Sequence, residues 1–250
     1  ASRAATLQEE SGGRAVFGIG AGDASTLSAL GIERDRPLRR VLESFKIARD
    51  LWGGESVEHD GAVSVTGATL NYAVDPPPVY VGAQGPDMLR MAAKHADGVL
   101  YNASHPRDVA WATQRVEEGI SERPDARGSF DFVVQASVSV AANDTAARET
   151  ARQAAAVIAG GAAPPVLARH GIDADLADEI GNLVSEGEFR EAFAAVSEPM
   201  LDAFCVAGTP SDVAAQFREI RKHADGVVAA TPLGPDRADA IDLLADAIPA

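Results

Sequence analysis

Residues 79–102 read VYVGAQGPDMLRMAAKHADGVLYN, and this stretch decides the class of fold. The apolar run at 79–83 predicts a strand that ends at Gln84-Gly85-Pro86, and residues 87–95 predict a helix. A second apolar run follows at 98–102. A strand, a helix and a further strand in so short a space are typical of a parallel βαβ unit.

The same order recurs along the chain. Apolar runs at 14–20, 130–140 and 226–231 predict three more strands, which makes five. Pro37 opens an amphipathic helix that Gly53-Gly54 ends. We therefore expect an α/β protein with a parallel sheet.

Three further segments are read from the residues alone. The N-terminal ten residues predict a helix, and residues 55–72 predict a small hairpin with a connecting loop. Residues 160–207 contain breaks and short helical pieces, so we expect an insertion of small helices there. Thr209-Pro210 then has the pattern of a helix start.

The composition excludes several classes of protein. The chain has 250 residues, 46% of them apolar, which is not a disordered composition. Its net charge is −15, so a basic face that binds nucleic acid is disfavoured. Acidity with only three lysines suits the high-salt cytoplasm of a halophile, or equally reflects a GC-rich genome. Both readings stay open.

Other classes are excluded by what the sequence lacks. Cys205 is the only cysteine, so no internal disulfide is expected. No apolar run reaches the roughly 20 residues that span a membrane, and no signal peptide is visible, so we expect a cytoplasmic protein without a membrane partner. The five histidines lack metal-ligand spacing, so no metal site is expected and each histidine reads as a surface or structural residue.

Small and polar residues follow the predicted strands, where ligands bind in parallel α/β folds. The segment from Gly82 to Pro86, through Ala83, Gln84 and Gly85, precedes a helix and is the best phosphate candidate, although a tight turn also favours glycine. Asp23, after Gly22, either binds a ligand or caps a helix. Asn102, Ala103 and Ser104 follow another strand.

The glycines at 18, 20 and 22 do not match the dinucleotide fingerprint, because Asp23 stands where its third glycine belongs. No G-x-S-x-G elbow is present, and no general acid or base stands out.

Several stretches, in order along nearly the whole chain, together resemble one family. They are Ser11–Asp23 (SGGRAVFGIGAGD), Ala29–Glu33 (ALGIE), Val79–Pro86 (VYVGAQGP), Ala96–Ser104 (ADGVLYNAS), Arg169–Asp173 (RHGID) and Asp202–Pro210 (DAFCVAGTP). The family is that of the archaeal F420-dependent 5,10-methylenetetrahydromethanopterin reductases, in the bacterial-luciferase-like superfamily of barrels.

The resemblance implies a (β/α)₈ TIM barrel that binds coenzyme F420 and a pterin substrate. It implies reversible hydride transfer from the reduced coenzyme to the methylene carbon of the pterin, a step of one-carbon metabolism and methanogenesis. It places Gly22 and Asp23 against the coenzyme, puts Gly82–Gly85 at its phosphate side, and lines the barrel mouth with Asn102, Ala103 and Ser104. The family pattern has proline where this chain has Ala21, and an aliphatic residue where it has Tyr101.

The resemblance also implies that about three strand–helix units of the family precede Ser11 and are not in this sequence. The family's proposed acid lies in those units, so no catalytic residue is assigned here. We thus expect residues 1–250 to form a single incomplete barrel, and the protein to be a homo-oligomer, a dimer or a tetramer. The alternatives are an F420-dependent methylenetetrahydrofolate reductase of a halophile, an FMN-dependent luciferase-like monooxygenase, and an inactive truncated relative.

Overall fold

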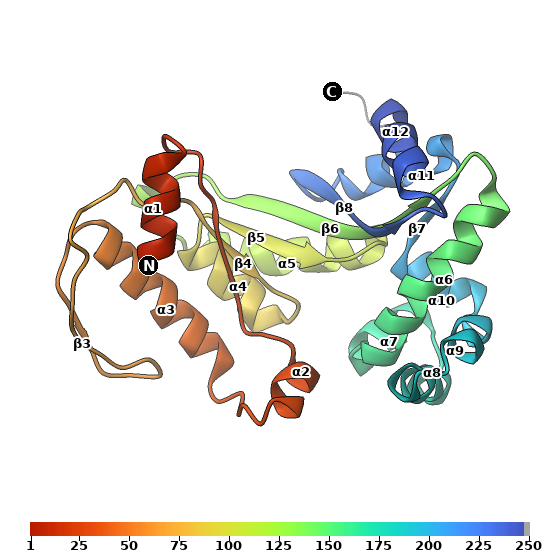
Figure 1. Cartoon of the computed structure of the whole chain (residues 1–250), viewed down its shortest axis with the longest axis horizontal. Helices are drawn as coiled ribbons and strands as arrows, with labels where there is room; N and C mark the ends of the chain where they lie inside the picture. Colours follow the sequence, from red (N-terminus) through yellow and green to blue (C-terminus); the bar gives the residue numbers. More distant parts are fainter. Residues whose placement is uncertain (248–250) are drawn as a thin grey trace. The chain divides into compact units, whose positions relative to one another are not determined.

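The computed structural model of this chain describes residues 1–247 (Figure 1). Residues 248–250, the end of the predicted single domain, lie outside the described part. The chain divides into two compact units. Unit 1 is formed by residues 1–101 and 114–132, and unit 2 by residues 102–113 and those from 133 onward.

Unit 1 is built on three neighbouring parallel strands in the order β1-β4-β5. Their bounds are β1 Phe17–Gly20, β4 Val79–Gly82 and β5 Gly98–Asn102. The register places Gly20 of β1 beside Gly82 of β4, and Gly82 beside Leu100 of β5. The three carboxyl ends therefore meet at one edge, which is where a ligand site is expected in a parallel sheet.

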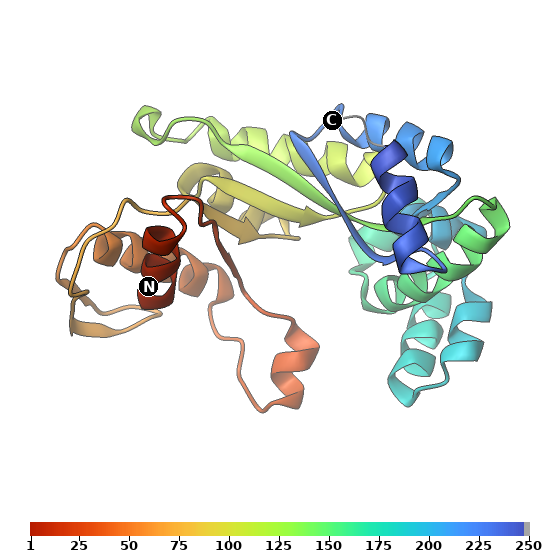
Figure 2. The same ribbon diagram turned by 45° about the horizontal axis from the view of Figure 1, so that its top comes forward.

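The helices of unit 1 pack on these strands or lie in the connections between them. They are α1 Ser2–Glu10, α2 Ala24–Ala29, α3 Pro37–Trp52, α4 Pro86–His95, the later part of α5 Pro106–Ile120, and a short 3₁₀ turn at Asp125–Arg127. Figure 2 shows α2 at the far end of the loop that leaves β1 and returns to α3. The predicted hairpin is present as β2 Val57–His59 paired with β3 Val65–Ala68.

Unit 2 has a second set of parallel strands, in which β6 lies between β7 and β8. The strands are β6 Asp131–Val140, β7 Val206–Gly208 and β8 Gly226–Leu233. The helices are α6 Asp144–Gly161, α7 Pro164–His170, α8 Ala174–Glu186, α9 Phe189–Ala195, α10 Glu198–Phe204, α11 Pro210–Ile220 and α12 Arg237–Ala247. Figure 1 shows α7 to α10 gathered beside α6.

The cores follow from the side chains that these elements bury. In unit 1, Phe45 and Trp52 of α3 are completely buried, and so are Val79 and Val81 of β4. In unit 2, the buried face of α6 consists of alanines, which let α8 approach closely. A Cβ added at Gly160 would lie 2.5 Å from the Cα of Gly181 on α8, so both glycines are required by this crossing.

Two predictions about the elements need correction. Residues 1–247 contain six parallel strands and not five, because Val206–Gly208 forms β7 beside Val138–Val140 of β6. The stretch 160–207 is therefore a helical insertion only as far as Phe204. A three-residue strand is too short to show an alternating pattern, and its neighbour β6 is distant in the sequence. Helix α2 was also not predicted.

Candidate functional site

The carboxyl ends of β1 and β4 carry a bare stretch of backbone. Gly18 and Gly20 of β1 and Gly82 of β4 are exposed, and we call these three residues the glycine face. A Cβ added at Gly18 would meet no atom within 4 Å. At Gly20 and Gly82 the nearest atoms are carbonyl oxygens, 3.7 and 3.9 Å away. The fold has room for side chains there, so the glycines leave open a surface on which a planar group can lie against the backbone.

The turn after β1 is shaped by Gly22 and Asp23. Gly22 has a φ of +76°, which favours glycine. The Oδ1 atom of Asp23 accepts hydrogen bonds from the backbone N–H and the hydroxyl of Thr26, both at 2.8 Å. Asp23 is therefore the N-cap of α2, which is one of its two predicted roles. Its side chain is exposed, and contact with a ligand stays a prediction.

The turn between β4 and α4 has the features that bind an anion. The N–H of Ala83 donates to the carbonyl of Leu100 at 3.1 Å, whereas Gln84 and Gly85 are exposed. Gly85 is the N-cap of α4 and has no side chain, so none of its own atoms caps the first N–H groups. Asp87 in this first turn is paired with Arg90 at 2.9 Å, and Arg90 also pairs with Glu118 at 2.5 Å. This geometry supports the predicted phosphate position.

The remaining predicted residues lie in unit 2, at the start of α5. Asn102 is exposed. The N–H of Ala103 donates to the carbonyl of Gln135 at 3.1 Å, and the buried hydroxyl of Ser104 accepts from the N–H of Ser137 at 3.1 Å. Both bonds fasten this turn to β6.

The nine predicted residues are thus divided between the units. Gly22, Asp23 and the segment 82–85 belong to unit 1, where the strand register brings Gly82 beside Gly20. Asn102, Ala103 and Ser104 belong to unit 2. Sequence reasoning did not commit to Gly20, although the glycine pattern that ends β1 contains it.

A hollow of about 210 Å³ adjoins the end of β1 in unit 1. Apolar side chains form part of its lining, together with Arg34, Arg40, Glu33 and Asp35. Asp35 is paired with Arg36 at 2.9 Å and lies 3.9 Å from Arg40. The hydrogen bond to Asp35 raises the pKa of Arg36. Sequence reasoning missed these arginines, whose signal is the run RDRPLRR at 34–40.

A larger hollow, of about 600 Å³, is lined by residues of α3 and β2 and contains none of the predicted site residues. Glu43 on its wall accepts hydrogen bonds from Arg39 at 2.6 Å and from the N–H of Val63 at 3.0 Å. These bonds, the one from Arg39 above all, lower the pKa of Glu43 to about 2. The negative charge of Glu43 is therefore already stabilised by hydrogen bonds within the chain.

Cys205 is buried, and burial raises the pKa of its thiol to about 12, which disfavours the nucleophilic thiolate near neutral pH. Within residues 1–247 no three histidine, cysteine or acidic side chains gather as metal ligands. None of the helices in this part of the chain is long and apolar enough to cross a membrane.

The sequence profile of a family described as luciferase-like monooxygenase matches residues 1–227. The chain belongs to the luciferase-like monooxygenase family. Its predicted luciferase-like α/β fold is thereby confirmed. The incomplete barrel and the single domain stay predictions.

Within this family, the chain is similar to 5,10-methylenetetrahydromethanopterin reductases. The enzyme of Archaeoglobus fulgidus is 40% identical to it over 98% of this chain and 75% of its own length. The enzyme of Methanolobus tindarius is 36% identical over 98% of this chain and 76% of its own.

Solved structures agree with this placement. The coenzyme F420-dependent tetrahydromethanopterin reductase of Methanopyrus kandleri superposes with a TM-score of 0.85 and 32% identity, and the match covers 97% of this chain and 76% of that one. An F420-dependent secondary alcohol dehydrogenase, in complex with an F420–acetone adduct, superposes with a TM-score of 0.74 over 98% of this chain and 72% of that one. Its identity is 19%, so this likeness shows the fold alone.

Proposed function

We propose that this protein is an F420-dependent 5,10-methylenetetrahydromethanopterin reductase. The single observation that carries the proposal is the likeness to enzymes of that name over 98% of the chain, at 34 to 40% identity. The glycine face supports it, because Gly18, Gly20 and Gly82 leave bare backbone beside the turn at 82–85, which is the proposed phosphate position. A coenzyme that joins a planar ring to a phosphate needs both features.

The residues present fit such a coenzyme. A Cβ on Gly20 or Gly82 would have only ordinary contacts, with carbonyl oxygens 3.7 and 3.9 Å away, so the absence of side chains there leaves room for a ring. The first N–H groups of α4, after Gly85, would bind the phosphate, and the exposed Gln84 would add a side-chain amide. Gly22 and Asp23, which follow β1, would complete the contacts within unit 1. Contact of Asn102, Ala103 and Ser104 with the coenzyme stays a prediction.

When bound, the reduced coenzyme would supply the hydride; its addition to the methylene carbon would break one of the two carbon–nitrogen bonds of that carbon, the released nitrogen would take a proton, and the methyl product would remain. The part of the chain in this reaction is positional. The glycine face would fix the plane of the ring, and the turn at 82–85 would hold the phosphate and so fix the position of the ring along β1 and β4. No side chain of the described residues is assigned as the proton donor.

Binding of F420 and of FMN, measured separately by fluorescence titration, tests the proposal. We expect F420 to bind and FMN to bind far more weakly. Binding of FMN alone would favour the monooxygenase alternative and would overturn the proposal.

Turnover then tests the substrate. We expect reduction of methylenetetrahydromethanopterin by reduced F420, with methylenetetrahydrofolate as the competing carrier in a parallel assay. Reduction of the folate alone would favour the halophile alternative that the net charge of −15 suggests. F420 binding without turnover of either carrier would favour the inactive relative. The homo-oligomer, the cytoplasmic location and the archaeal, halophilic source stay predictions.

A further inference from the structure

A buried group of charged side chains joins two helices of unit 2, at the start of α5. Asp108, in the first turn of α5, is only 4% exposed. Its carboxylate accepts a hydrogen bond from the guanidinium of Arg169, and its Oδ2 lies 2.7 Å from Nε2 of His170. Both partners are the last residues of α7. We call Asp108, Arg169 and His170 the α5–α7 lock.

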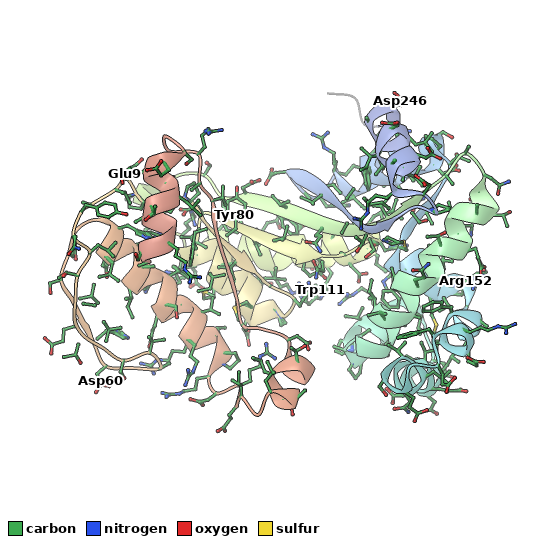
Figure 3. All side chains as sticks on the ribbon, in the orientation of Figure 1. Glu9, Asp60, Tyr80, Trp111, Arg152 and Asp246 are labelled. Atoms are coloured by element: carbon green, nitrogen blue, oxygen red, sulfur yellow. The ribbon has the colours of Figure 1, made fainter. Side chains whose placement is uncertain are left out.

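Neighbouring side chains hold the lock in place. The guanidinium of Arg169 lies over the ring of Trp111, 4.5 Å from its centre, and Figure 3 labels this tryptophan on α5. Nη1 of Arg107 donates to the carbonyl of Arg169 at 2.7 Å, which satisfies a carbonyl at the end of α7. The ring of His170 meets that of Phe204 edge-on at 6.1 Å.

The lock is adjacent to the turn that contains Asn102, Ala103 and Ser104. His105 follows this turn, and its Nδ1 accepts the N–H of Arg107 at 3.1 Å, so its ring caps α5. The His105 ring also packs edge-on against His170, with ring centres 4.9 Å apart. Burial, followed by the charge of His170, lowers the pKa of His105 and keeps Nδ1 free to accept.

The turn is therefore fixed from two sides. Ala103 and Ser104 fasten it to β6 through bonds of 3.1 Å. His105 and Asp108 fasten the residues after it to the end of α7. If Asp108 loses its charge, its ties to Arg169 and His170 weaken, and α7 is held to this region by the bond from Arg107, the Trp111 ring and the His105 ring alone. The second fastening is then weaker, so the turn and the first residues of α5 gain freedom to move.

From this geometry we infer that Asp108 is a positioning residue, which holds the turn at 102–105 in its ligand-binding conformation by tying α5 to α7 through Arg169 and His170. The inference rests on the proposed function for the identity of the ligand, coenzyme F420, and for its contact with the turn at 102–105. None of the three lock residues needs to touch it.

Asp108→Asn is the test variant, and Glu198→Gln is its matched control. Glu198 of α10 pairs with Arg148 and Arg152 of α6, each at 2.5 Å, so it also ties two helices of unit 2 together. Arg152 is labelled in Figure 3. The control removes one negative charge from a tie between α10 and α6, neither of which contains the turn at 102–105.

The first measurement is the Kd for F420, at a temperature well below the Tm of each variant. We expect Asp108→Asn to raise the Kd about tenfold, within the range typical of coupling between neighbouring sites. The KM for F420 should rise with it while kcat at saturation changes little. Glu198→Gln should lower the Tm without changing either constant. Equal Kd values for Asp108→Asn and the unchanged protein would overturn the inference.

The second measurement needs no ligand and separates the inference from the proposed function. Amide hydrogen exchange of residues 102–108 should be faster in Asp108→Asn than in Glu198→Gln. Absence of F420 binding by the unchanged protein would overturn the proposed function, whereas unchanged exchange at the turn would overturn the positioning role. If Asp108→Asn does not fold, His170→Gln removes one partner only, and the same two readouts apply.

Discussion

Replacing Gly82 by alanine should change stability and activity in opposite directions. The folded chain leaves space for a Cβ at this position, but the proposed coenzyme ring would occupy that space. The added Cβ would meet only the carbonyl oxygen of Ile19, at 3.9 Å, which is ordinary van der Waals contact. Glycine inside a strand costs about 0.5–1 kcal/mol relative to alanine. We therefore expect Gly82→Ala to raise the free energy of unfolding by up to about 1 kcal/mol.

Activity should change in the opposite direction. A ring resting on the bare backbone of Gly82 would have to move by about 1 Å or more, since carbon atoms approach no closer than roughly 3.5 Å. A displacement of this size costs about 100-fold in rate when reacting atoms must lie 3–3.5 Å apart. That factor corresponds to about 2.7 kcal/mol of transition-state stabilisation. We expect kcat/KM for reduced F420 and methylenetetrahydromethanopterin to fall by this factor.

Urea unfolding and steady-state kinetics measure the two effects in one preparation. Gly161→Ala, at the end of α6, is the control, because its Cβ would meet no atom within 4 Å and Gly161 belongs to no predicted site. It should leave kcat/KM unchanged. If Gly82→Ala keeps kcat/KM within about threefold of the unchanged protein, the ring does not lie on the glycine face and the reasoning fails.

Three further results are expected. Asp23→Ala should weaken α2 by about 1 kcal/mol through loss of its N-cap, seen as faster amide exchange at Thr26. Asp23→Asn keeps a side-chain oxygen that can cap the helix. A higher Kd of this variant for F420 would show that Asp23 contacts the ligand, and an unchanged Kd would leave it the capping role alone. Because the pKa of Glu43 is lowered from 4.5 to about 2, its contribution to stability is present above about pH 4.5 and is lost as the pH falls through about 2. Below pH 4.5, urea unfolding should show the free energy of unfolding falling more steeply in the unchanged protein than in Glu43→Gln. Parallel pH dependences of the two proteins would contradict this. Cys205, whose pKa is about 12, should react with a thiol reagent at pH 8 only after unfolding in urea, and reaction in the folded protein would refute its burial.

Much of the fold was predictable, because its signals are local. The apolar runs at 79–83 and 98–102, with Gly85-Pro86 between them, specify strand, turn and helix within a few residues. All five predicted strands are present. β7 was missed because a three-residue strand is defined by its pairing with β6, and a pairing between distant segments leaves no local pattern.

The candidate site was predictable in part for the same reason. Strand ends can be read from the sequence, so Gly82 and Asn102 were identified as ligand candidates. The sequence could not choose between the two roles of Asp23, and the bond to Thr26 shows that it caps α2. His170 was expected to be a surface or structural residue, and its side chain is buried against Asp108, a partner that could not be named from the sequence.

The amino-acid sequence by itself determined the order of strands and helices, the glycines at the strand ends and the resemblance to a reductase family. Each of these depends on residues close together in the chain, where periodicity and backbone preferences act. The tertiary structure decided that Gly20 lies beside Gly82 and that Asp108 meets His170, 62 residues away. Strand register and the docking of α7 on α5 are set by packing over the whole unit, so only the folded chain shows which side chains act together.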